Sequence, residues 1–233
     1  VMTDLDIGMN QRLCKPFVWD DKRQYDTGKV MTAEELEAGK DFGRYKDVDG
    51  DGIPWRTLPG THPSKGAFFT RGTTRNAYAQ YSERGPDYIY NMERLLKKFA
   101  TAATLVPQPV LRLCDEPQKY GVIYYGSTTP AMREALDVLE ADGVRVDALR
   151  LRAFPFPKVV PDFIGAHDKV FVVEQNRDAQ MRSLLINELE VDPARLPAIL
   201  HYDGTPITAR FIVAAIRKDI AEHAARTANK EAA

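Results

Sequence analysis

Four short apolar runs alternate with helical patterns in the second half of the chain, at residues 121–126, 146–152, 169–175 and 198–202. Strands that lie about 25 residues apart, with helices between them, typically form right-handed βαβ units and a parallel sheet covered on both faces. The pattern therefore predicts an α/β domain from about residue 120 to 225. It has three layers, α/β/α, with at least four mostly parallel strands, of which the middle ones are fully buried.

Helix signals flank these runs. Thr129 is expected to cap a helix whose first turn holds Pro130 and which Gly143 ends. Thr208 is expected to begin a last amphipathic helix. Before the first run, apolar residues at helical spacing predict a helix of about fifteen residues that ends ahead of Pro107 and Pro109; they are Tyr88, Met92, Leu95, Leu96 and Phe99.

Residues 11–86 differ from the second half of the chain, because periodic apolar segments are few and Gly, Pro, Asp and Thr are frequent. Thr32 and Glu35 have the spacing of a capping box, which predicts one short helix. The rest is expected to be a long irregular arm that lies across another domain or chain, or forms an active-site surface. The arm is followed by a domain at residues 87–233.

The segment DVDGDG in this arm places Asp47, Asp49 and Asp51 at alternate positions, with Gly52 after the third, as in a calcium-binding EF-hand loop. Such a loop needs a bidentate glutamate at position twelve, and that position is Leu58. Consecutive Asp-Gly pairs are also typical of tight turns. Turn chemistry is the favoured interpretation, and a divalent-metal site at the three aspartates is the alternative.

Composition narrows the class of protein. Hydrophobic residues at 44% and charged residues at 28% are ordinary for a globular protein. A net charge of −1 argues against non-specific nucleic-acid binding. No apolar run approaches a membrane span, and no signal-peptide pattern is present, so we expect a cytoplasmic protein.

The two cysteines, Cys14 and Cys114, are too few for this chain to ligate an iron–sulfur cluster or a structural zinc by itself. We expect both cysteines to be free intracellular thiols. The opening VMTDLDIGMN resembles the last residues of a buried strand that runs out into a loop, so we expect a fragment of a longer protein.

Candidate chemistry lies at the carboxyl ends of the predicted parallel strands, where open α/β sheets bind ligands. The most polar of these loops runs from Glu174 to Asp178 and includes Asn176 and Arg177. It could hold an ion pair that closes a helix start, or it could contact a ligand or a neighbouring domain. Thr128 could bind an anion or serve only as a helix cap. The four histidines show no Ser-His-Asp or Cys-His spacing.

Several long segments resemble one family, including GKVMTAEEL, DVDGDGIPWRTLPGTHPSKGAFFTRGT, NMERLLKKF, HDKVFVVEQNRDAQMRSLLINELE and LHYDGTPITARFI. With VMTDLDIGMN they are similar to the C-terminal part of the alpha subunit of 2-oxoacid:ferredoxin oxidoreductases, most of all the 2-oxoglutarate branch. The resemblance covers essentially the whole chain. It implies a transketolase C-terminal-like domain from about Gly121 onward, and it makes residues 1–10 the exit of a pyrimidine-binding thiamine domain.

The resemblance also implies an activity. Such enzymes decarboxylate a 2-oxoacid on thiamine diphosphate, reduce ferredoxin through iron–sulfur clusters and form an acyl-CoA. The activating glutamate is expected upstream of this chain, and the diphosphate with its Mg²⁺ and the cluster in a beta subunit. No catalytic residue is expected here. Supporting or interface contacts are expected from Glu174, Asn176, Arg177, Asp178, Thr128 and Arg71.

By this resemblance, the DVDGDG segment belongs to a connection between domains. The chain departs from other branches at Gly72–Asn76, where those carry a Gly-Glu-His-Asp-like stretch. Two other functions stay open: a non-catalytic interaction module, or a divalent-ion-binding protein that uses Asp47, Asp49 and Asp51.

Overall fold

The computed structural model describes residues 5–9, 11 and 13–231 and divides the chain into two compact units. The sheet unit comprises Val1–Leu13 and Val106–Ala233, and the arm unit comprises Cys14–Leu105. The expected domain division between residues 86 and 87 stays a prediction. What the structure shows is that the helix beginning at Gly85 packs with the residues before it.

The sheet unit contains a five-stranded sheet in the order β1-β3-β2-β4-β5. The strands are β1 (Val110–Arg112), β2 (Tyr120–Tyr124), β3 (Asp147–Arg150), β4 (Lys169–Glu174) and β5 (Ala198–Leu200). The four predicted strands are all present and parallel. β1 was not predicted; it pairs antiparallel with β3 at the edge of the sheet, and its three residues are exposed.

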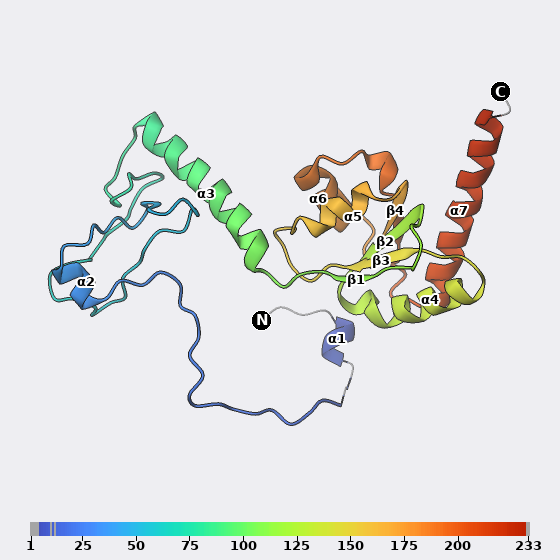
Figure 1. The fold of residues 1–233 in the computed structure, drawn as a ribbon, viewed down its shortest axis with the longest axis horizontal. Helices are drawn as coiled ribbons and strands as arrows, with labels where there is room; N and C mark the ends of the chain where they lie inside the picture. The colour runs from blue at the N-terminus through green and yellow to red at the C-terminus, as the bar shows by residue number, and fades with distance from the viewer. Residues whose placement is uncertain (1–4, 10, 12, 232–233) are drawn as a thin grey trace. The chain divides into compact units, whose positions relative to one another are not determined.

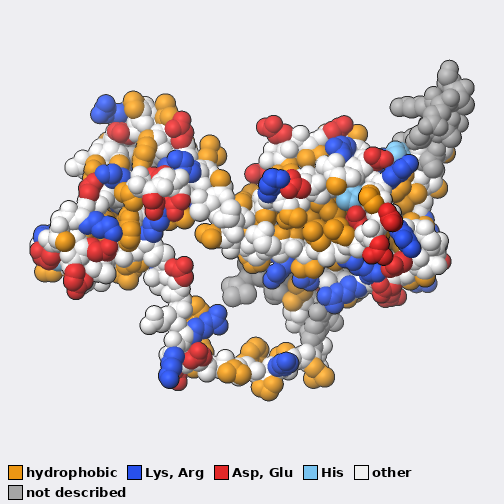
Figure 2. All heavy atoms as spheres, in the orientation of Figure 1, with side chains coloured by type: hydrophobic (Ala, Val, Ile, Leu, Met, Phe, Trp, Pro, Cys, Tyr) orange, Lys and Arg blue, Asp and Glu red, His pale blue; other side chains and the backbone are white. Residues whose placement is uncertain are grey.

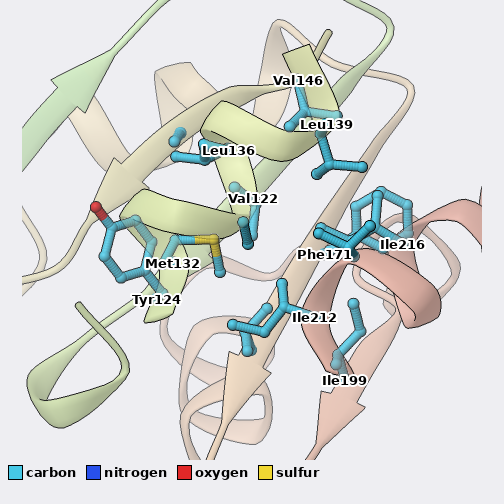
Figure 3. Close-up of a cluster of buried hydrophobic side chains, with 14 of the residues drawn as sticks. Val122, Tyr124, Met132, Leu136, Leu139, Val146, Phe171, Ile199, Ile212 and Ile216 are labelled. Atoms are coloured by element: carbon cyan, nitrogen blue, oxygen red, sulfur yellow. The ribbon is translucent and has the colours of Figure 1, made fainter. Parts of the chain in front are cut away.

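Helices cover both faces of this sheet, which confirms the three-layer prediction (Figure 1). One face packs against α4 (Thr129–Ala141) and α7 (Ala209–Glu231). The other packs against α5 (Val159–Gly165) and α6 (Gln180–Leu189). Figure 3 shows the first of these clusters, where Met132 and Leu136 of α4 lie over Val122 and where Ile212 and Ile216 of α7 approach Phe171.

The central strands are buried on both faces, as predicted. In β4, the residues from Val170 to Val173 are all fully inaccessible, and so are Val122 and Ile123 of β2. A strand covered on both sides by helices reads as a continuous apolar run rather than an alternating one. This is why β2 and β4 were visible in the sequence.

The helix ends follow the predicted signals, with one correction. Gly143 follows the end of α4 with a φ of 76°, and Thr208 accepts a hydrogen bond from the backbone N–H of Phe211, as expected. Thr129 is not the cap of α4. It is the first helical residue, and its hydroxyl donates to the carbonyl of Gly126 because a 3₁₀ turn at Gly126–Thr128 precedes the helix.

The arm unit has little regular structure, as predicted, and its helices are α2 (Ala33–Glu37) and α3 (Gly85–Leu105). The capping box of Thr32 and Glu35 is confirmed. α3 is 21 residues long, longer than predicted, and the burial of its faces is unexpected. Asn91 and Arg94 are buried, whereas Leu95 is half-buried and the other predicted apolar positions are 41–71% exposed; those are Tyr88, Met92, Leu96 and Phe99.

Polar contacts explain why the arm forms a compact unit despite its few periodic apolar residues. Arg94 donates to the carbonyl of Gly52 at 3.1 Å, and Thr101 donates to that of Asp51 at 2.6 Å. The side chain of Asn91 donates to the carbonyl of Arg75 at 2.6 Å. Because the polar side of α3 satisfies backbone groups of the loops, that side is the one the loops cover.

The start of the chain differs from its interpretation as the end of a strand. Residues Leu5–Met9 form a short helix, α1, and residues 1–4 and 10 lie outside the described part. After it runs an extended stretch whose large apolar side chains are at least 79% exposed, namely Leu13, Phe17, Val18 and Trp19. Figure 2 shows hydrophobic side chains along this stretch. Among the described residues, no helix combines the length and apolar character needed to cross a bilayer.

Candidate functional site

Glu174, the last residue of β4, is fully buried at the carboxyl end of the sheet. Its carboxylate accepts hydrogen bonds from the backbone N–H groups of Met181 and Arg182, both at 2.8 Å, and from the side-chain amide of Asn176 at 2.7 Å. The hydroxyl of Tyr125 lies 3.5 Å away. Both carboxylate oxygens therefore have donors.

These contacts make Glu174 the cap of α6. The residue before that helix, Ala179, has a left-handed backbone with φ of 50° and no side chain that can accept a hydrogen bond. The first N–H groups of a helix lack intrahelical partners, and negative charge is favourable beside them. A carboxylate from the preceding strand thus supplies what a Ser or Asp at the cap position would.

Gln175 joins this loop to the loop after β2. Its side-chain amide donates to the hydroxyl of Ser127 at 2.8 Å and lies 3.3 Å from that of Thr128, which is 2% exposed. The structure therefore brings Thr128 next to the Glu174–Asp178 loop, in agreement with the rule for parallel strand ends. A buried hydroxyl engaged in this way positions a loop.

The outer part of the loop faces solvent. Arg177 pairs with Asp178 at 2.7 Å, and their side chains are 73% and 57% exposed. The side-chain oxygen of Asn176 accepts from the backbone N–H groups of Asp178 and Gln180. Arg71 is also exposed but belongs to the arm unit. Contacts of Arg177, Asp178 and Arg71 with a partner stay predictions.

The acidic segment of the arm holds a cation from its own chain. One oxygen of each of Asp47, Asp49 and Asp51 lies within 4.8 Å of the others, a spacing that could hold a metal ion. The ammonium of Lys29 lies 2.5 Å from Asp49 and 2.7 Å from Asp51, and it also donates to the carbonyl of Ile53 at 3.0 Å. An ammonium of the same chain therefore already lies between two of the three carboxylates.

The backbone of the same segment forms the turns that the Asp-Gly pairs indicate. Gly50 and Gly52 have φ of 82° and 77°, and the N–H of Gly50 donates to Asp47. Asp51 accepts from the N–H of Ile53 at 2.8 Å. Each of these two aspartate side chains thus shapes its own turn.

Replacing Lys29 with methionine is expected to destabilise the arm unit by about 1 kcal/mol near neutral pH, because two carboxylates lose their partner. Burial tends to lower the pKa of Lys29, but hydrogen bonds to Asp49 and Asp51 raise it above its ordinary value. Burial tends to raise the pKa of Asp51, but the bond from Lys29 lowers it. The difference between wild type and variant should therefore vanish as acid protonates Asp51 and again as alkali neutralises Lys29. Denaturant unfolding across pH measures it.

Lys22→Met is the matched control for Lys29→Met, since Lys22 is exposed. Equal losses in the two variants would show that the ion pairs contribute nothing specific. Equilibrium dialysis with Ca²⁺ tests the alternative metal site. No saturable binding is expected for the wild type, because a cation would have to displace the Lys29 ammonium; saturable binding would support the metal-site interpretation.

A buried group of hydrogen bonds around His167, which the sequence did not predict, connects α5 to β3. His167 is 4% exposed and follows α5; its Nδ1 lies 2.7 Å from the carbonyl of Phe163 and its Nε2 3.1 Å from Asp147. Asp147 also accepts from the N–H of Cys114 at 2.7 Å. Burial, together with Asp147, raises the pKa of the Cys114 thiol, which disfavours the reactive thiolate. The group is structural.

Comparison with known proteins finds distant relatives of the chain. No family model matches it. Over 182 residues it is 25% identical to 2-oxoacid:ferredoxin oxidoreductase 2, subunit alpha, of Aeropyrum pernix, a match that covers 76% of the chain and 27% of that subunit. Over 140 residues it is 25% identical to the 2-oxoacid:ferredoxin oxidoreductase subunit alpha of Saccharolobus solfataricus, covering 58% and 22%. The chain spans about a quarter of the length of these curated relatives.

A solved structure shares the fold. The 2-oxoglutarate:ferredoxin oxidoreductase from Magnetococcus marinus, described with 2-oxoglutarate, coenzyme A and succinyl-CoA bound, superimposes with a TM-score of 0.67 at 21% identity, over 78% of this chain and 31% of that one. A split-gene transketolase gives a TM-score of 0.39 over 47% of the chain. The chain is thus distantly homologous to alpha subunits of 2-oxoacid:ferredoxin oxidoreductases, which confirms the family that its motifs indicated.

Proposed function

We propose that this chain is a C-terminal portion of the alpha subunit of a 2-oxoglutarate:ferredoxin oxidoreductase, and that it serves assembly rather than chemistry. The complete enzyme would oxidatively decarboxylate the oxoacid, reduce ferredoxin and form an acyl-CoA in the cytoplasm. The observation that carries the proposal is the 182-residue match to an alpha subunit. This match is longer than either compact unit, so both units take part in the likeness.

The cofactors of such an enzyme do not fit the residues of this chain. Its two cysteines cannot supply the four thiolates of an iron–sulfur cluster. The buried carboxylate at the sheet edge, Glu174, already accepts from α6 and Asn176, so it has no free face for the aminopyrimidine of thiamine diphosphate. We therefore assign no step of the reaction to this chain and place the cofactors in the rest of the enzyme and in a beta subunit.

The described residues can hold the loops at the carboxyl end of the sheet in a fixed position. Glu174 fixes the start of α6, and Gln175 fixes the neighbouring loop, so Arg177 and Asp178 project from a fixed backbone. An exposed charged pair on a well-supported loop suits recognition of a partner surface, where complementary charge gives specificity and speeds association. This supports an interface role for the loop.

Reconstitution tests the proposal. The complete alpha subunit, mixed with its candidate beta subunit, thiamine diphosphate, Mg²⁺ and CoA, is expected to reduce ferredoxin when 2-oxoglutarate is added, and neither subunit alone should do so. A stable heteromer without any 2-oxoacid-dependent reduction would favour the non-catalytic interaction module. Activity with another 2-oxoacid but not with 2-oxoglutarate would correct the substrate.

Arg177→Ala in the complete alpha subunit is expected to weaken association with the beta subunit on the order of tenfold, through loss of a charged interface contact. Titration of one subunit with the other measures the dissociation constant. Arg133→Ala, which removes an exposed arginine of α4, is the control and should leave it unchanged. Unchanged association in Arg177→Ala would mean that the loop only starts α6.

A further inference from the structure

The arm unit contains a cavity of about 220 Å³ that no part of the proposed function uses. It lies between α3 and the loop before it, and its lining includes Tyr45, Thr73, Thr74, Arg75, Asn91 and Arg94. The volume is below that of a typical pocket for a drug-sized ligand, so a small group would fill it.

Two arginines of this lining have no acidic partner. Within the described part of the chain, neither Arg75 nor Arg94 forms an ion pair with a carboxylate within 4.0 Å. The Nε atoms of both are buried without a hydrogen-bond acceptor. Arg94 is only 7% exposed. A buried donor on a charged group that lacks a partner is costly and rare, so the described residues do not fully satisfy either arginine.

The remaining contacts of the two guanidinium groups do not neutralise them. Arg94 donates to the carbonyl of Gly52, and Arg75 to the hydroxyl of Tyr45 at 3.3 Å and the carbonyl of Gly72 at 3.2 Å. Both groups lie beside the ring of Tyr45, at 5.7 and 5.1 Å from its centre. These neutral partners orient the arginines but leave their charge uncompensated.

Other charged groups nearby do not remove the positive potential. Burial lowers the pKa of Arg94, Arg44 acts in the same direction, and Tyr90, Tyr45 and Asp47 oppose them. The carboxylate of Asp47 is itself 3.6 Å from the ammonium of Lys97. Three arginines therefore surround Tyr45, with one carboxylate that another cation shares.

We propose that this cavity binds a phosphate-type oxyanion between Arg75 and Arg94. Guanidinium groups bind phosphate and carboxylate through charge-assisted hydrogen bonds. A planar carboxylate is satisfied by one fork-shaped guanidinium. Donors from two elements, the loop and α3, with the hydroxyls of Thr73 and Thr74 added, suit a tetrahedral anion better. The ligand is free phosphate or a phosphomonoester group on a larger molecule.

Calorimetry with the 233-residue chain tests this, with inorganic phosphate as the probe and chloride at equal ionic strength as the reference. Saturable binding at one site is expected, and Arg75→Gln should weaken it on the order of tenfold or more, the loss of a hydrogen bond to a charged group. Arg84→Gln is the matched control, because Arg84 is an exposed arginine of the arm unit outside the cavity lining. No saturable binding, or equal weakening by both variants, would overturn the proposal.

Two further measurements complete the experiment. If Arg75→Gln fails to fold, Thr74→Val decides, since it removes one lining hydroxyl at nearly constant shape; lower affinity supports the site and unchanged affinity overturns it. Competition by coenzyme A, but not by dephospho-coenzyme A, would identify a phosphomonoester of a larger ligand, whereas competition by neither would exclude coenzyme A and favour free phosphate. These measurements need no enzymatic activity, so they stand apart from the test of the proposed function.

Discussion

Gly52→Ala is expected to destabilise the arm unit by about 3 kcal/mol or more. Gly52 has a φ of 77°, which costs a residue with a side chain about 1–2 kcal/mol. A Cβ at this position would also overlap the backbone nitrogen of Lys98 and lie 2.6 Å from the carbonyl oxygen of Arg94. The loop would have to move away from α3, and the hydrogen bond from Arg94 to Gly52 would be lost with it.

Gly50→Ala is the matched control for this prediction. Gly50 has a φ of 82°, but no atom lies within 4 Å of the place that the alanine Cβ would take, so only the backbone contribution of about 1–2 kcal/mol should be lost. Denaturant unfolding followed by tryptophan fluorescence compares the two, because both tryptophans of the chain, Trp19 and Trp55, lie in the arm unit. Equal losses in the two variants would contradict the close contact between Gly52 and α3.

Glu174→Ala is expected to destabilise the sheet unit by about 3 kcal/mol. The change leaves the N–H groups of Met181 and Arg182 and the amide of Asn176 without their acceptor, at a position that solvent does not reach. Loss of a helix cap typically costs about 1 kcal/mol, and buried donors without a partner add to it. Unfolding followed by circular dichroism measures the loss in the helix-rich sheet unit.

Two comparisons make the result of Glu174→Ala specific. Glu188→Ala removes an exposed carboxylate from the same helix and should change stability by no more than about 0.5 kcal/mol. The tryptophan signal of the arm unit should not change in either variant. A loss in Glu174→Ala as small as that in Glu188→Ala would mean that water replaces the carboxylate at the start of α6.

The sheet was predictable because burial of its central strands on both faces leaves a continuous apolar run in the sequence. Val122 and Phe171 are buried on one face of the sheet and Ile123 and Val172 on the other, so β2 and the middle of β4 are apolar at consecutive positions. The edge strand β1 has three exposed residues and is defined only by its pairing with β3, a long-range contact that a local pattern does not contain. Periodicity misses an edge strand of this kind, whereas it found the other edge strand, β5, in which Ile199 is buried.

The faces of α3 were not predictable for the opposite reason. Spacing indicated Tyr88, Met92, Leu95, Leu96 and Phe99 as the apolar side of the helix, and apolar residues usually face a core. In the structure, backbone carbonyls of the arm loops accept hydrogen bonds from the side chains of Asn91 and Arg94. The loops therefore cover the polar side of the helix. Helical periodicity identifies the helix, but it does not reveal which face has partners.

The sequence predicted which strand-end loops lie together, but not what their residues do. The rule for parallel strand ends led to the Glu174–Asp178 loop, and Thr128 does lie beside it. The sequence suggested an ion pair at the helix start, whereas a single buried carboxylate caps α6 from five residues before the cap position. A left-handed Ala179 makes this possible, and alanine gives no sign of that backbone in a sequence.

The ammonium of Lys29 among Asp49 and Asp51 has a consequence for how the acidic loop responds to its surroundings. A metal ion that binds only the folded state stabilises it by an amount that grows with the logarithm of the free ion concentration, so the fold weakens when the ion is diluted or chelated. A cation attached to the same chain has a fixed local concentration. The DVDGDG loop should therefore keep its shape through any change in cellular calcium, and a chelator in the buffer should leave the arm unit untouched.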